Sequence, residues 1–356
     1  MAFFRDMLSG GESLFKDAEA LNYDHQPKIV PYREKEMRQI ATAMRPLFQG
    51  REGMNVVVYG PSGVGKTVAC RHLLDELKDE TDEIVPIYVN CWHKNTSFKI
   101  LLEISAVLGY KFTQNKRTDE LFDIVKKMLN EQAAVFVFDE IDKMEELDFV
   151  YNLLEEIYKK SIILISNKKE WIAELDPRIK SRLTAEVLEF KPYNYTEAKG
   201  ILLQRREIAF VSGVWEDDAF EAIARKTSEM QDIRSGLYLM KEAGNAAEER
   251  SSKKIAMADV EKAVSKLDEF SVKDKATLED ESKMILDVIK ENSGKRIGEI
   301  YRIFQDKGGK TAYKTFQRRI AKLEEDKFIS TKKIAGGSEG ATTIISFEGE
   351  KKLTEF

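Results

Sequence analysis

Eight consecutive residues have the types and spacing of a loop that binds a chain of phosphates. They are Gly60, Pro61, Ser62, Gly63, Val64, Gly65, Lys66 and Thr67, with Val68 directly after them. Phosphates need many converging N–H donors and no side chains in the way, and glycines let the backbone curl around them. Lys66 is expected to reach the β- and γ-phosphates, and Thr67 to offer its hydroxyl to Mg²⁺. The segment therefore predicts a site for ATP or ADP with Mg²⁺.

Two adjacent carboxylates follow an apolar run about 70 residues downstream. Asp139 and Glu140 come directly after residues 135–138, which read Val-Phe-Val-Phe. Beside a phosphate-binding loop, we expect Asp139 to hold the metal ion and Glu140 to orient or deprotonate an attacking water. The alternative is a pair of solvated acids at a strand end.

Three further polar residues are candidates for the same chemistry. Asn167 follows another buried run, at the strand end where open α/β sheets bind ligands, and it could position the water or cap the next helix. Arg182 could face the nucleotide of a neighbouring subunit, and Arg234 could reach the γ-phosphate of this chain. Taken alone, either arginine is more often a solvated surface residue.

The surrounding pattern predicts the elements that would hold these residues. Five short apolar runs alternate with amphipathic stretches between residues 55 and 190, which indicates a doubly wound parallel α/β sheet. We expect its strands at 56–59, 84–89, 135–138, 162–165 and 187–190, and helices at 67–78 and 149–160. After Pro192 four helices are expected, at 196–210, 216–227, 233–250 and 257–270, followed by a charged linker at 268–280. The last part predicts helices at 281–291, 297–305 and 311–326, then a hairpin of 328–334 and 342–347 around a glycine-rich turn.

Composition narrows the class of protein. The 356 residues suggest two or three domains, and no apolar run is long enough to span a bilayer. The two cysteines and three histidines form no metal-ligand pattern, and we expect a cytoplasmic, nucleoid-associated protein. The net charge is −5, yet residues 302–333 carry ten basic and four acidic side chains. This asymmetry favours a nucleic-acid-facing module on a more acidic body.

Taken together, these motifs resemble the AAA+ ATPases, and more narrowly the archaeal replication initiators, relatives of the eukaryotic origin recognition complex. The matching segments are residues 29–34 (Ile-Val-Pro-Tyr-Arg-Glu), 139–142 (Asp-Glu-Ile-Asp), Asn167, 175–183 (Leu-Asp-Pro-Arg-Ile-Lys-Ser-Arg-Leu), 192–193 (Pro-Tyr) and 231–237. The resemblance implies that Val30, Tyr32, Arg33 and Tyr193 contact the adenine. It also implies that Arg182 acts as an arginine finger and Arg234 as the second sensor. Tyr32 replaces a usual histidine, and Gln231 replaces a usual glycine.

The same resemblance assigns DNA-binding parts. An insertion at about residues 91–117 would touch the minor groove. The C-terminal part would be a winged helix, whose DNA-binding residues would be Lys310, Lys314, Arg318, Arg319, Gly336 and Gly337. The expected domains are an α/β base at 1–191, a helical lid at 192–270 and a winged helix at 271–356.

The sequence thus predicts an ATP-dependent initiator with slow hydrolysis that binds duplex origin DNA. Its expected partners are the replicative minichromosome maintenance helicase and other initiator copies on DNA. No membrane is expected as a partner. The alternatives are a DNA-binding regulator of transcription or segregation, such as a divergent initiator paralogue, and a clamp-loader-like assembly ATPase.

Overall fold

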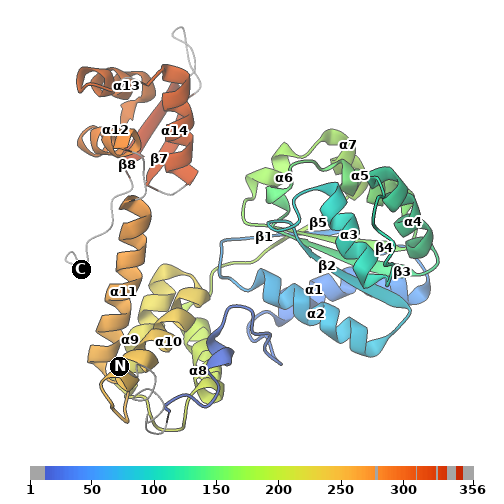
Figure 1. The fold of residues 1–356 in the computed structure, drawn as a ribbon, viewed down its shortest axis with the longest axis horizontal. Helices are drawn as coiled ribbons and strands as arrows, with labels where there is room; N and C mark the ends of the chain where they lie inside the picture. The colour runs from blue at the N-terminus through green and yellow to red at the C-terminus, as the bar shows by residue number, and fades with distance from the viewer. Residues whose placement is uncertain (1–12, 277–279, 310, 326–327, 335–341, 348–356) are drawn as a thin grey trace. The chain divides into compact units, whose positions relative to one another are not determined.

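The chain forms two compact units, Met1–Ser265 and Lys266–Phe356, which are described separately. The computed structural model in Figure 1 describes residues 13–276, 280–309, 311–325, 328–334 and 342–347.

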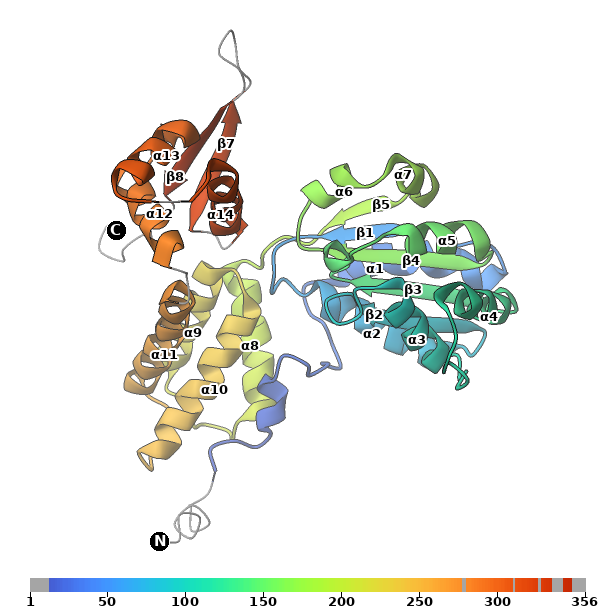
Figure 2. The same ribbon diagram turned by 45° about the horizontal axis from the view of Figure 1, so that its top comes forward.

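The first unit contains a five-stranded parallel sheet in the order β2-β3-β4-β1-β5, as Figures 1 and 2 show. The strands are β1 (Val56–Tyr59), β2 (Ile84–Asn90), β3 (Ala133–Asp139), β4 (Lys160–Ser166) and β5 (Glu186–Glu189). All of their pairings are parallel, and Asn90 at the end of β2 lies opposite Asp139 at the end of β3. The expected parallel α/β sheet is confirmed, and the carboxyl ends of its strands meet along one edge.

Helices cover both faces of this sheet (Figure 2). One face carries α1 (Glu34–Met44) and α2 (Lys66–Glu80), whereas the other carries α3 (Ser97–Val107), α4 (Thr118–Asn130), α5 (Asp148–Glu156) and α7 (Pro177–Leu183). Shorter elements are η1 (Ala18–Leu21), η2 (Arg45–Gln49), η3 (Ile141–Lys143) and α6 (Glu170–Glu174).

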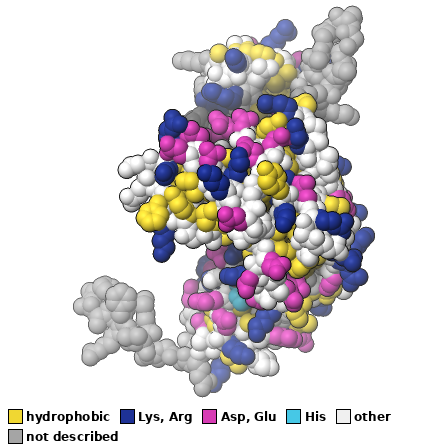
Figure 3. Space-filling model, turned by 90° about the vertical axis from the view of Figure 1, so that its right-hand side faces the viewer, with side chains coloured by type: hydrophobic (Ala, Val, Ile, Leu, Met, Phe, Trp, Pro, Cys, Tyr) yellow, Lys and Arg dark blue, Asp and Glu magenta, His cyan; other side chains and the backbone are white. Residues whose placement is uncertain are grey.

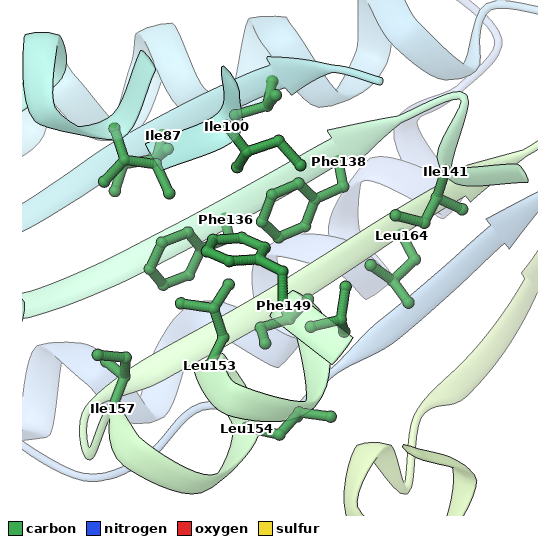
Figure 4. Packing of buried hydrophobic residues seen from close by; sticks show 14 of the residues in the cluster. Ile87, Ile100, Phe136, Phe138, Ile141, Phe149, Leu153, Leu154, Ile157 and Leu164 are labelled. Carbon is green, nitrogen blue, oxygen red and sulfur yellow. The ribbon is translucent and has the colours of Figure 1, made fainter. Parts of the chain in front are cut away.

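Side chains alternate across β3, so each face of the sheet has its own core. Val135 and Val137 pack toward α1 and α2, while Phe136 and Phe138 pack toward α3, α4 and α5. Figure 4 shows the two phenylalanines beside Phe149 of α5. Phe136 and Phe138 are fully buried, and burying a side chain of this size contributes about 2–3 kcal/mol.

Helix α5 ends at Glu156, four residues before the expected end at 160. Ile157 is already extended, and Lys160 is the first residue of β4. The buried ammonium of Lys160 donates to Glu52 and to the carbonyl of Ile157. The expected helix therefore ends one turn early, and Lys160 belongs to β4.

Four helices follow the sheet and form the lid. They are α8 (Tyr195–Ala209), α9 (Asp217–Met230), α10 (Ile233–Glu249) and α11 (Met257–Ala276). Asn194 caps α8 and Asp232 caps α10, each by accepting a backbone N–H of the first turn. The linker expected at 268–280 is wrong over its first part, because α11 continues to Ala276. That stretch has no glycine or proline, so its charged residues are compatible with a solvated helix.

The second unit packs three helices on a small antiparallel sheet. Its elements are α12 (Asp280–Glu291), β6 (Lys295–Arg296), α13 (Ile297–Asp306), α14 (Tyr313–Glu325), β7 (Ile329–Ile334) and β8 (Thr342–Phe347), with strand order β6-β8-β7. The core includes Ile289, Phe304, Phe316 and Ile345. The expected glycine-rich turn lies outside the described residues.

Charges on the α/β part are mixed rather than segregated. On the face shown in Figure 3, basic and acidic side chains are interspersed, and apolar side chains lie between them, some of them in groups. Among the residues that the structure describes, no helix is long and apolar enough to cross a bilayer.

Candidate functional site

The phosphate-binding loop connects β1 directly to α2, as its position in the sequence predicts. Two of its glycines are required by close neighbours. A Cβ on Gly60 would lie 2.2 Å from the carbonyl oxygen of Phe190, and one on Gly65 would lie 2.5 Å from the hydroxyl of Tyr193. Gly65 also has φ +88°, which glycine adopts without strain. The loop is therefore built from backbone, with its N–H groups and the start of α2 available to an anion.

Lys66 is buried at the first position of α2. Its Nζ donates to the carbonyls of Gly60 and Pro61, at 2.8 and 2.6 Å, and to Oδ1 of Asn167 at 2.8 Å. Burial lowers the pKa of Lys66 to about 8, although the nearby charge of Asp139 opposes the shift. The structure thus brings Asn167 of the β4 end and the loop lysine into direct contact.

Asp139 is buried at the end of β3 and accepts three hydrogen bonds. Its Oδ2 accepts from Thr67 Oγ1 at 2.6 Å and from the Tyr88 hydroxyl at 2.8 Å, and its Oδ1 accepts from Glu140 N at 2.9 Å. Glu140 has φ +54°, a left-handed conformation that is uncommon for a residue with a side chain. Burial, followed by the charges of Asp139 and Asp142, raises the pKa of Glu140.

These oxygens fit a magnesium ion. Thr67 Oγ1 and Asp139 Oδ2 are hard donors in contact with each other at the mouth of the loop. Mg²⁺ is usually bound by one or two such groups together with phosphate oxygens and waters. The described residues contain no cluster of three His, Cys, Asp or Glu side chains that could hold a metal alone. The donor set therefore suits a metal that arrives with a nucleotide.

The loop opens into a pocket between the edge of the sheet and the lid. Its walls come from the N-terminal segment, the loop, the strand ends and the lid helices. The lining residues are Asn22–Gln26, Pro27, Ile29–Pro31, Ser62–Val68, Arg71, Asp139, Glu140, Asn167, Tyr193, Ile201, Gln204, Arg205, Ile233, Arg234 and Leu237.

The start of α10 contacts the loop itself. Ile233 N donates to the carbonyl of Gly63 at 3.3 Å, and the Arg234 guanidinium donates to the hydroxyl of Ser62. Arg234 also pairs with Asp232, whose Oδ1 lies 1.9 Å from the position that a Cβ on Gly63 would take. Arg234 thus reaches the pocket from the lid, and the first turn of α10 fits only against a glycine.

The N-terminal candidates divide between the pocket and its supports. Val30 and Tyr193 line the pocket, whereas Tyr32 and Arg33 do not. Tyr32 has φ +64°, and its hydroxyl lies against Gly200 in the middle of α8. The Arg33 guanidinium lies 3.9 Å from the centre of the Tyr193 ring. It donates to Val64 O and Lys191 O, so it supports the loop without lining the pocket.

Several lining residues had no signal in the sequence. Residues 23–26 have no motif, and Arg205 is one of many charged residues on a lid helix. Yet Arg205 is buried and donates to the carbonyls of Ala20 and His25. Tyr88 does not line the pocket but contacts Asp139, and it could have been found, because it lies two residues before Asn90 in β2 and so shares a face with the strand end opposite Asp139.

The remaining candidates belong to α7 and to the second unit. Arg182, on α7, pairs with Glu155 and does not line the pocket. In the second unit, Lys314 and Arg318 are exposed on α14 and Arg319 is half-buried. Lys310, Gly336 and Gly337 lie outside the described residues.

Comparison with known proteins identifies both parts of the first unit. Residues 50–169 match the family described as "AAA domain", and residues 199–265 match the "Cdc6 AAA+ ATPase-type lid domain". The chain is 29% identical to ORC1-type DNA replication protein 1 of Archaeoglobus fulgidus, over 99% of this chain and 92% of that protein. It is 30% identical to ORC1-type DNA replication protein 1 of Sulfolobus acidocaldarius, over 96% of this chain and 91% of that protein.

A solved structure agrees with the sequence relatives. The Aeropyrum pernix ORC1 protein in complex with DNA is similar at a TM-score of 0.73 and 25% identity, over 96% of this chain and 95% of that one. The match extends over both units of the chain. With its phosphate-binding loop, strand-end carboxylates and lid arginine in one pocket, the chain belongs to the archaeal family of ORC1-type (Orc1/Cdc6) replication initiators, which are AAA+ ATPases.

Proposed function

We propose that this chain is an ATP-dependent initiator of DNA replication that binds origin duplex DNA and helps to recruit or load the replicative minichromosome maintenance helicase. The observation that carries the proposal is the pocket in which Lys66, Asp139 and Asn167 of the base face Arg234 of the lid. A nucleotide held there touches both parts, so its binding and loss would change how the lid is held. ORC1-type relatives and an ORC1 structure in complex with DNA support the assignment to replication.

The residues of the site have separate roles in this proposal. The loop N–H groups and Lys66 would bind the phosphates, and Thr67 and Asp139 would hold Mg²⁺, which would supply positive charge beside the phosphate oxygens. Glu140 orients and deprotonates a water, and the raised pKa of its carboxyl suits that exchange of protons. Asn167 holds Lys66 in place and orients the same water. Hydrolysis is slow and acts as a switch.

Arg182 would act on a second copy of the chain. It lies outside the pocket of its own chain and is held by Glu155, with its Cζ 6.0 Å from the centre of the Tyr151 ring. This placement on α7 leaves the Arg182 side chain about half exposed. Several copies on one origin would bring such an arginine to a neighbour's nucleotide.

The second unit would bind the duplex as a winged helix. Its three helices are followed by the antiparallel strands β7 and β8, and α14 takes the place of a recognition helix. Lys314 and Arg318 are exposed and four residues apart, so they share a face of α14. The insertion at 91–117 would add a second DNA contact in the first unit.

Three measurements test this function. Lys66→Ala should abolish binding of ATP while the second unit stays folded, and Glu140→Ala should bind ATP without turnover. Footprinting on genomic DNA should then show protection confined to one repeat-bearing intergenic region. Protection scattered over promoters would favour a regulator. The absence of duplex binding at physiological salt would favour an assembly ATPase that acts on proteins.

A further inference from the structure

The metal-binding carboxylate of the site has a neighbour that neither a motif nor the nucleotide chemistry assigns. Tyr88, in the edge strand β2, donates its hydroxyl to Oδ2 of Asp139 at 2.8 Å. The same oxygen accepts from Thr67 Oγ1 at 2.6 Å. One carboxylate oxygen therefore receives two hydroxyl donors, one from the phosphate-binding loop and one from β2.

The strand register places Tyr88 in this position. Tyr88 pairs with Val137, and Asn90 pairs with Asp139, so the ring lies one pleat below the carboxylate on the same face of the sheet. It packs against the core beneath α1 and α2 as a half-buried side chain. The guanidinium of Arg71, one turn after Thr67 on α2, lies 5.3 Å from the centre of the ring. Backbone and packing thus hold the phenol oxygen beside Asp139.

The two hydroxyl donors are not equivalent once a metal ion binds. Thr67 is the residue whose hydroxyl the magnesium would take in a phosphate-binding loop of this type, so its bond to Asp139 must be given up or shared. Tyr88 has no such second task.

We propose that Tyr88 is a positioning residue for the metal-nucleotide complex: its hydroxyl holds the Asp139 carboxylate in the orientation that receives Mg²⁺. The inference rests on the proposed function, because it takes ATP or ADP with Mg²⁺ as the ligand. Groups that orient a metal ligand from outside the coordination sphere typically change metal affinity about 10- to 100-fold when they are removed.

Tyr88→Phe is the direct test, because it removes the hydroxyl and keeps the ring that packs against the core. Binding of a fluorescent N-methylanthraniloyl-ADP is measured first in EDTA and then during a titration with MgCl₂. We expect unchanged affinity in EDTA and a rise of about 10-fold in the Mg²⁺ concentration that gives half of the metal-dependent effect. Direct Mn²⁺ binding in the presence of ADP, followed by electron paramagnetic resonance, should weaken by the same factor.

Tyr158→Phe is the matched control. Tyr158 is a largely exposed tyrosine of the same unit. It lies two residues before β4 and therefore at the amino ends of the strands, whereas the site lies at their carboxyl ends. It should leave both titrations as in the wild type. A double-mutant cycle separates positioning from packing: in an Asp139→Asn background, Tyr88→Phe should change Mn²⁺ affinity less than twofold.

The outcomes distinguish a failure of the positioning role of Tyr88 from a failure of the proposed function. A wild-type chain that binds no nucleotide overturns the proposed function and the inference with it. Wild-type binding that responds to Mg²⁺, together with an identical response of Tyr88→Phe, overturns the inference alone. Equal weakening of Tyr88→Phe in EDTA and in Mg²⁺ assigns Tyr88 to packing and overturns the positioning role. If Tyr88→Phe melts well below the wild type, the Asp139→Asn cycle decides, because a packing defect would persist in that background.

Discussion

The Asp232 carboxylate performs two tasks where the lid meets the phosphate-binding loop, and two substitutions separate them. It caps α10 by accepting Arg234 N at 2.9 Å, and it pairs with the Arg234 guanidinium at 3.2 Å. Asp232→Asn keeps an oxygen that can cap the helix and removes the charge. Asp232→Ala removes both, so the difference between the two variants isolates the cap.

The structure sets the size of each effect. Loss of an N-cap costs about 1 kcal/mol, which for a unit of this size lowers the melting temperature by roughly 2–4 °C. The Asp232 and Arg234 side chains are 25% and 48% exposed, so screening limits their ion pair to about 0.2–1 kcal/mol. In Asp232→Asn this ion pair is absent, so Arg234 no longer has to give it up when it interacts with a phosphate. We therefore expect ATP to bind about 1.4- to 5-fold more tightly to Asp232→Asn, with a melting temperature near that of the wild type.

Isothermal titration with ATP and a thermal melt of each variant supply the two readouts. Asp218→Asn on α9, a first-turn aspartate that does not line the pocket, is the control for loss of one negative charge. Weaker ATP binding to Asp232→Asn than to the wild type would refute the reasoning, because it would show that the carboxylate positions Arg234 rather than competing for it. A melt of Asp232→Asn as low as that of Asp232→Ala would refute the capping role.

Three further predictions follow from the core, the lid and the second unit. Phe136→Ala should lower the free energy of unfolding of the first unit by about 3–5 kcal/mol in a urea titration, and a loss below 1 kcal/mol would contradict its burial. Asp259→Asn should destabilise the lid by about 2 kcal/mol, because Asp259 accepts from the Arg250 guanidinium and from Ala256 N. Burial alone would raise the pKa of Asp259, but these hydrogen bonds hold it below its ordinary value. Its stabilisation is therefore present near pH 7 and should disappear as pH falls below about 4, which melts of the two proteins across pH would show. Lys314→Ala with Arg318→Ala should reduce the salt dependence of duplex binding by about 2 in the log–log slope, whereas Lys283→Ala on α12 should leave it unchanged.

The parts of the site that sequence reasoning located depend on short stretches of chain. The loop from Gly60 to Thr67 is contiguous, and Asp139 and Asn167 each follow a run of buried strand residues. In a parallel sheet the carboxyl ends of the strands meet at one edge, so local pattern was enough to bring these side chains together.

The parts that escaped prediction depend on contacts between distant segments. Tyr32 stands where the resembling family has a histidine; its backbone is left-handed, and its hydroxyl lies against Gly200, 168 positions later. Arg33 stacks on Tyr193 and so acts on the loop from outside the pocket. The C-terminal end of α11 was missed for a different reason, because a charged stretch without glycine or proline suits a linker and a solvated helix equally well.

Helix α10 contacts the phosphate-binding loop at its first turn and the N-terminal segment near its last turn. Its first turn rests on Gly63, and near its other end Glu248 accepts from Ser13 and from the backbone of Leu14. The 17 residues of α10 span about 25 Å, so a tilt of about 10° at the loop moves the far end by about 4 Å. From Leu14 the chain returns through η1 to residues 23–26, which line the pocket. A tilt of α10 about its contact with Gly63 would therefore also move the N-terminal segment, which forms part of the wall of the same pocket.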